Sequence, residues 1–123
     1  MLINLTNHPA SQWPENQVKA AQKYGEIVDI PFPDIPPGWS EGEIQELVKE
    51  YFGLIKKVCK EKGEKVFVHI MGELSFTFAL SSVLIKEGFT CIVSTAKRDA
   101  IENNNLKITK FRFIRFRELF IQL

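Results

Sequence analysis

A run of apolar, β-favouring residues at 66–70, followed by Gly72, is the feature that most constrains the fold. A run of this length predicts a strand buried on both faces, as in a parallel sheet covered by helices. A helical pattern follows, so the next helix is expected to begin at Glu73 or Leu74. Such a helix would direct free N–H groups and its positive dipole end out of the sheet, where phosphate is favoured. A tight turn without a ligand is the alternative interpretation.

The rest of the chain repeats the alternation of strand and helix. Strands are expected at residues 2–6, 27–30, 90–94 and 107–116, and helices from Pro14 to Gly25, from Ser40 to Gly63 and from residue 74 to Gly88. Ser40 and Glu43 form a capping-box pattern at the start of the longest helix. This order predicts an α/β fold with a doubly wound, mostly parallel, Rossmann-like sheet and a β-rich C-terminal edge. At 123 residues, we expect a single domain, 1–123.

The last predicted strand has an apolar face that changes sides midway. Phe111 and Phe113 are odd-numbered, whereas Ile114 and Phe116 are even-numbered. Because side chains alternate along a strand, this change implies a bulge or twist near residue 114.

The net charge of +1 provides no global field toward nucleic acid or membrane, so neither a long nucleic acid nor a membrane is an expected partner. The charge is uneven, because seven basic and two acidic residues lie between Lys97 and Arg117. Arg112 is interpreted as an edge charge that opposes aggregation, while the role of Arg115, like that of Arg117, stays open.

The two cysteines, Cys59 and Cys91, lie in apolar patterns without metal-ligand spacing. They are interpreted as small buried side chains of a protein in the reducing cytoplasm. Neither a secretion signal nor a run of membrane-spanning length is recognisable, so a cytoplasmic location is expected, with no metal and no cofactor.

Three expected loops follow strands and meet at one edge of a parallel sheet, where ligands bind at the switch point in strand order. The candidate ligand-binding residues in and beside these loops are Asn7, His8, Gly72, Glu73, Ser75, Thr77, Thr95, Lys97 and Arg98. Lys97 and Arg98 suit phosphate, although a solvated pair at the start of a helix is the alternative.

Several other candidate residues also have structural explanations. His8 can contact phosphate or a ribose hydroxyl, or simply cap a loop. Hydroxyls at Ser75 and Thr77 can bind a ligand or cap a helix. His69 lies within the apolar strand and is interpreted as a core residue. No catalytic residue is assigned; His8 and Lys97 are candidates, and the residues alone predict a phosphate-bearing ligand.

Five short motifs together resemble a known protein group. They are Leu5-Thr6-Asn7-His8-Pro9, residues 24–33, Met71-Gly72-Glu73 with Phe76-Thr77-Phe78, residues 94–98, and residues 111–118. The chain resembles small single-domain proteins encoded beside type III CRISPR systems, which are similar to the CRISPR-associated Rossmann-fold (CARF) sensors. The resemblance implies a homodimer that binds a cyclic oligoadenylate, with cyclic tetra-adenylate as the expected ring.

The resemblance leaves the activity open. The protein can retain the ring and lower the level of this messenger in antiviral signalling, or it can be a ring nuclease that cleaves the ring without metal, through the ribose 2′-hydroxyl. A non-enzymatic scaffold or interaction subunit is the third hypothesis. By position, the resemblance places Asn7, His8, Gly72, Glu73, Thr95, Lys97 and Arg98 in the site.

Overall fold

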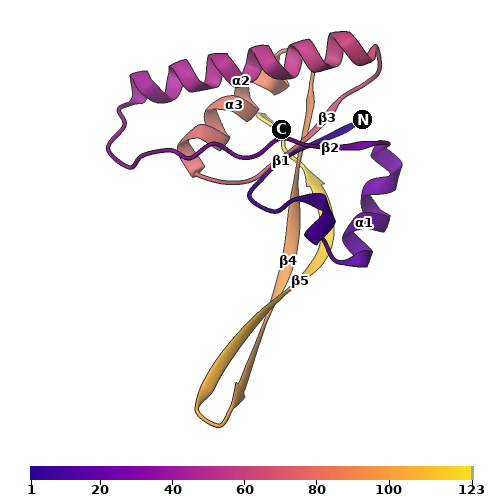
Figure 1. The fold of residues 1–123 in the computed structure, drawn as a ribbon, viewed down its shortest axis with the longest axis vertical. Coiled ribbons are helices and arrows are strands. Elements are labelled where there is room, and N and C mark those ends of the chain that lie inside the picture. Colours follow the sequence, from indigo (N-terminus) through magenta and orange to yellow (C-terminus); the bar gives the residue numbers. More distant parts are fainter. Residues whose placement is uncertain (123) are drawn as a thin grey trace.

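A five-stranded sheet in the order β2-β1-β3-β4-β5 forms the centre of the protein, seen in a computed structural model that describes residues 1–122 (Figure 1). The strands are β1 (Leu2–Leu5), β2 (Ile27–Asp29), β3 (Phe67–Ile70), β4 (Thr90–Asn103) and β5 (Leu106–Glu118). The first four are parallel, and β5 pairs with β4 in the antiparallel sense at the C-terminal edge. The predicted α/β class and mostly parallel sheet are confirmed.

Three α-helices connect the parallel strands. They are α1 (Glu15–Ala21), α2 (Glu41–Lys62) and α3 (Leu74–Lys86), with short 3₁₀ helices η1 (Ala10–Gln12) and η2 (Gln22–Tyr24) around α1. The predicted capping box at Ser40 and the left-handed cap at Gly63 bound α2. Within the described residues, no helix is both long enough and apolar enough to cross a membrane.

The alternation of side chains along β1 divides the core into two layers. Leu2 packs with Trp13 and Ala21 on the side of α1. Ile3 and Leu5 point the other way and pack against residues of α2 and α3. The sheet therefore has apolar clusters on both faces, as the apolar character of its short strands predicts.

A long hairpin made by β4 and β5 projects from the body (Figure 1). Its two turn residues, Asn104 and Asn105, have φ angles of 52° and 66°, as in a type I′ turn. We call residues 96–113 the hairpin arm. The prediction that the fourth strand ends at Ser94 was wrong, because pairing with β5 extends the strand to Asn103.

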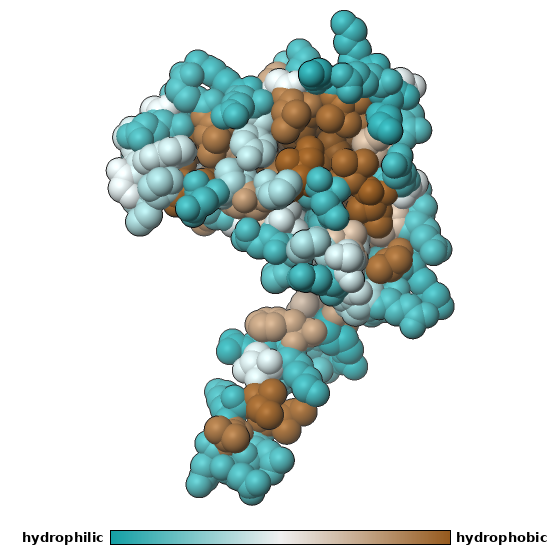
Figure 2. Space-filling view, viewed as in Figure 1, coloured by the Kyte–Doolittle hydropathy of each residue, from teal (hydrophilic) through white to brown (hydrophobic). Residues whose placement is uncertain are grey.

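The tip of the hairpin arm carries exposed apolar side chains (Figure 2). Ile101, Leu106 and Ile108 are 48%, 66% and 46% exposed. Ile101 and Ile108 are cross-strand partners and therefore share one face of the arm.

The predicted bulge is confirmed at Ile114. Arg115 pairs with Thr95 and Phe113 pairs with Ala96, which leaves Ile114 without a partner on β4. The Thr95 hydroxyl donates to the Arg115 carbonyl at 3.1 Å and accepts from the Arg115 N–H at 3.2 Å. The side chain of Thr95 thus stabilises the irregular part of the ladder.

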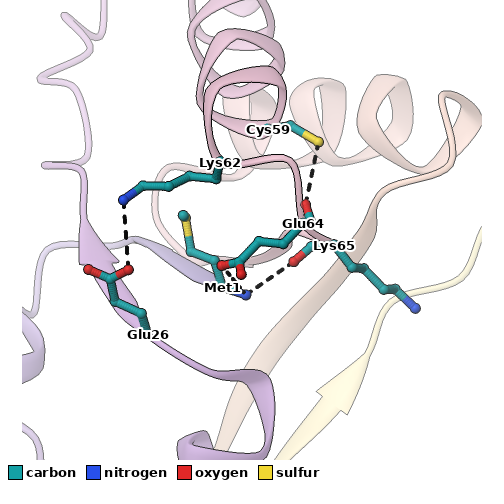
Figure 3. A network of polar contacts seen from close by, with 6 residues as sticks. All are labelled: Met1, Glu26, Cys59, Lys62, Glu64 and Lys65. Carbon is teal, nitrogen blue, oxygen red and sulfur yellow. Dashed lines mark hydrogen bonds and ion pairs between the residues drawn. The ribbon is translucent and has the colours of Figure 1, made fainter.

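Polar contacts link the start of β1 to the connection between α2 and β3 (Figure 3). The amino group of Met1 donates to the Lys65 carbonyl at 3.1 Å and pairs with Glu64 at 3.4 Å. Nearby, Lys62 and Glu26 form a 3.8 Å ion pair between exposed side chains, which stabilises little in water.

Candidate functional site

A cleft of about 510 Å³ lies at the carboxyl ends of β1 and β3. In the strand order, β2 lies next to β1 toward one edge of the sheet, whereas β4 lies next to β3 toward the other edge. The order of the strands therefore reverses direction between β1 and β3. Such a switch point is the usual ligand site of an open α/β sheet. Asn7, His8 and Gly72, three of the predicted site residues, line this cleft together.

A larger hollow of about 710 Å³ lies along α2. Its lining includes Glu43, Glu46, Lys49 and Glu50, all exposed side chains on the outer surface of the helix. It lies away from the ends of the strands and offers no buried polar group, so the cleft at the switch point is the better candidate.

The loop after β1 has a fixed backbone and exposed side chains. Three side chains hold the backbone of His8: its N–H donates to the Thr6 hydroxyl at 3.1 Å, and its carbonyl accepts from Asn4 Nδ2 at 2.9 Å and from Trp13 Nε1 at 3.0 Å. The side chains of Asn7 and His8 remain exposed at the cleft. This arrangement presents both side chains to a ligand from a rigid support.

Beneath that loop, two buried polar side chains, Asn4 and His69, form a hydrogen-bonded chain with the exposed Asp29. Asn4 Nδ2 donates to Asp29 Oδ1 at 2.8 Å, and Asn4 Oδ1 lies 2.9 Å from Nδ1 of His69. Burial lowers the pKa of His69 to about 4, so its imidazole is neutral at neutral pH. His69 also lines the cleft, which its interpretation as a core residue did not anticipate.

The start of α3 differs from the expectation of free N–H groups. The Glu73 carboxylate accepts from the N–H of Ser75 at 2.8 Å and from the N–H of Phe76 at 2.9 Å. The Ser75 hydroxyl also donates to it at 2.7 Å, and this bond, with the two backbone bonds, lowers the pKa of Glu73. The expectation of free amides for phosphate was therefore wrong for Ser75 and Phe76, because the chain's own carboxylate occupies these two N–H groups.

Packing explains why residue 72 is a glycine. A Cβ at this position would overlap the ring of Phe32, which belongs to the proline-rich connection after β2. Phe32 in turn packs edge-on against the buried Phe76, with ring centroids 5.4 Å apart. Gly72 thus lets this connection close over the start of α3.

Of the remaining candidates, Thr95, Lys97 and Arg98 lie on β4 and Thr77 lies in α3. Arg98 pairs with Phe111, which lines the cleft, and cross-strand partners share a face. Lys97 pairs with Arg112 and therefore lies on the opposite face of the hairpin arm. Thr95 belongs to the bulge, and Thr77 lies within α3, away from the cleft lining.

Sequence reasoning missed several lining residues, among them Trp13, Met71, Ser94 and Phe111. One signal was available: polar Asn4 and His69 lie within apolar strands, and buried polar side chains need partners. Within residues 1–122, no cluster of His, Cys, Asp and Glu suits a metal ion.

The comparisons with known proteins place the chain in a family. No curated protein and no solved structure matches it significantly. The model of an uncharacterized family matches residues 1–117, which is nearly the whole chain. The chain therefore belongs to the uncharacterized protein MJ1673 family.

Proposed function

We propose that the protein binds a cyclic oligoadenylate, with cyclic tetra-adenylate as the preferred ring, and lowers its free level in type III CRISPR antiviral signalling. The observation that carries this proposal is the cleft at the switch point, lined by Asn7, His8 and Gly72. We also assign the sheet, with apolar clusters on both faces, to the doubly wound, Rossmann-like class that the sequence resemblance implies.

The cations for the phosphates come from the hairpin arm in this proposal. The arm carries five basic and two acidic side chains, whereas the start of α3 is occupied by Glu73. Arg98 is the arm's basic residue directly opposite Phe111, whose side chain is 71% exposed. An exposed aromatic ring beside a cation suits a nucleotide, because bases stack on aromatic faces while arginine binds phosphate.

A homodimer is part of the proposal. Leu74 and Phe78 of α3 are 79% and 71% exposed, and a second copy can cover them. An isologous dimer has a two-fold axis, as does a ring with an even number of equal units. One ring can then contact the same residues of both copies.

Isothermal titration calorimetry with each cyclic oligoadenylate tests the proposal. We expect Arg98→Ala to weaken binding of cyclic tetra-adenylate about tenfold, as loss of a charged hydrogen bond does. Lys97→Ala is the matched control, because it removes the same charge from the opposite face and is expected to have a smaller effect. Lack of binding of every ring at micromolar protein would refute the proposal.

Ring cleavage is the alternative that the exposed His8 side chain favours. His8 would accept the proton of a ribose 2′-hydroxyl as the 2′-oxygen bonds to phosphorus, the P–O5′ bond breaks and the 5′-oxygen is protonated. The products are linear oligoadenylates with a 2′,3′-cyclic phosphate. Chromatography of the ring after incubation with the protein in EDTA tests this alternative, and a ring that stays intact rejects it. If the ring is cleaved, His8→Ala should abolish cleavage while retaining binding.

A scaffold role is the remaining alternative, favoured by the exposed apolar tip of the hairpin arm. It predicts a protein partner whose binding depends on Ile101 and Ile108 but not on Arg98. Failure to bind any ring, together with such a partner, would support it over the nucleotide proposal.

A further inference from the structure

One residue of the cleft lining has a buried polar atom without a hydrogen-bond partner. Two buried side-chain polar atoms within residues 1–122 lack a hydrogen-bond partner, Nε2 of His69 and Oγ1 of Thr77. Of these two residues, only His69 lines the cleft, and it is 2% exposed. Buried polar atoms are nearly always paired, so Nε2 of His69 is a group to which a ligand in the cleft can form a hydrogen bond.

The surrounding contacts determine which hydrogen His69 carries. Asn4 Nδ2 donates to Asp29 and to the His8 carbonyl, so its Oδ1 is the atom that faces Nδ1 of His69. Oδ1 also accepts from the Thr6 hydroxyl at 3.0 Å. An amide oxygen only accepts, so Nδ1 must carry the hydrogen of this neutral imidazole. Nε2 therefore has a free lone pair and acts as an acceptor.

The ring that holds this acceptor is fixed in orientation. Trp13 and Phe116 contact it edge-on, at centroid distances of 5.4 Å and 5.3 Å. With Nδ1 bound to Asn4 on β1, the imidazole has little freedom to turn. A ligand group thus meets an acceptor whose position is set before binding.

We propose that Nε2 of His69 accepts a hydrogen bond from the exocyclic amine of an adenine base and selects adenine against bases with a carbonyl at that position. This inference rests on the proposed function and names the feature of the ligand that the cleft recognises. Met71 and Phe111, which are 38% and 71% exposed, provide apolar surfaces for the flat faces of a base. A hypoxanthine base would place a carbonyl oxygen against the lone pair of Nε2, and two acceptors repel.

Two variants of His69 distinguish a role in selecting the base from a purely structural role. His69→Asn keeps a donor near the position of Nδ1, for the contact with Asn4, and removes the group at Nε2. His69→Gln places an acceptor near Nε2 and loses the contact with Asn4. Calorimetry measures the ratio of the Kd of cyclic tetra-inosinate to the Kd of cyclic tetra-adenylate for each protein.

We expect the wild type to prefer the adenine ring about tenfold or more, as a site built around a hydrogen bond does. His69→Asn should bring the ratio close to one, and His69→Gln should keep part of the preference. A purely structural role would weaken both rings equally and leave the ratio unchanged. Equal affinities of the wild type for the two rings, or an unchanged ratio in His69→Asn, would overturn this inference and leave the proposed function standing. Failure of the wild type to bind either ring would overturn both.

A second measurement uses the wild-type protein and does not depend on the folding of a variant. The chain has two histidines, so ¹⁵N spectra of the imidazoles contain two sets of signals, which His8→Gln assigns. We expect Nδ1 of His69 to be protonated and Nε2 to be unprotonated, with the Nε2 signal shifting when cyclic tetra-adenylate binds. A protonated Nε2 at neutral pH, or a signal that ignores the bound ring, would also overturn the inference.

Discussion

Replacing Gly72 by alanine distinguishes packing from ligand approach as the reason for a glycine in the cleft. Gly72 is outside the set of residues with positive φ, so alanine can adopt its backbone conformation. In open space, this change stabilises a protein by about 0.4–1 kcal/mol, because it restricts the unfolded chain. At Gly72 the new methyl group would instead overlap the ring of Phe32.

The structure therefore predicts a loss of stability where the backbone alone predicts a gain. Phe32 packs against the fully buried Phe76, so its ring cannot move without disturbing the core beneath it. Overpacking of this kind costs about 1–3 kcal/mol. After the gain from the unfolded chain, we expect Gly72→Ala to lower the free energy of unfolding by about 1–2 kcal/mol. In a chain of this length, that loss lowers Tm by about 3–10 °C.

Guanidinium unfolding, followed by the fluorescence of the buried Trp13, measures the effect. Phe32→Leu and the double variant complete a double-mutant cycle. We expect Gly72→Ala to cost at least about 1 kcal/mol less in the Phe32→Leu background, because the obstructing ring is gone. The reasoning is refuted if Gly72→Ala stabilises the wild type, or if its cost is the same in both backgrounds.

Three further predictions follow from the cap, the buried histidine and the hairpin arm. Glu73→Ala should lower Tm at pH 7. Because hydrogen bonds lower the pKa of Glu73, its contribution to stability depends on the ionised carboxylate, and the difference in Tm from the wild type should vanish as the pH falls below 4.5. A difference that persists at low pH would contradict this prediction. The pKa of His69 falls from 6.5 to about 4 on folding, so on acidification the unfolded chain binds a proton at this residue before the folded protein does. Lowering the pH from 6.5 to about 4 should therefore reduce the free energy of unfolding, measured with urea, by on the order of 3 kcal/mol. His69→Asn should lack this part of the pH dependence, and an equal slope in both proteins would argue against a buried neutral imidazole. Serine at Ile101, Leu106 and Ile108 should change the free energy of unfolding, measured with urea, by less than about 0.5 kcal/mol, because these exposed side chains lie outside the core. A large loss of stability would show that the arm packs on the body.

Features determined by neighbouring residues could be predicted from the sequence. The buried strand at 67–70, the capping box at Ser40 and the bulge at Ile114 each follow from a local pattern of apolar residues, caps or alternation. The outer half of β4 could not be predicted in this way. Both of its faces meet solvent in the hairpin arm, so it lacks the alternation that identifies a half-buried strand.

The candidate site was predictable in its position and only partly in its residues. Asn7, His8 and Gly72 meet because the loops of adjacent parallel strands must meet. The orientation of the Glu73 side chain and the pairing of His69 with Asn4, 65 residues away, depend on three-dimensional contacts that no local pattern encodes.

The unpaired Ile114 gives the two strands of the hairpin arm different tolerance to deletion. Losing one residue of β5 near this position can be absorbed by closing the bulge, with Arg115 and Phe113 keeping their partners on β4. β4 has no such slack, and a loss there would turn the following side chains to the other side of the arm. Arg98 would then no longer lie on the face of the arm that it shares with Phe111. The number of residues in β4, more than in β5, therefore determines which side chains of the arm face the cleft.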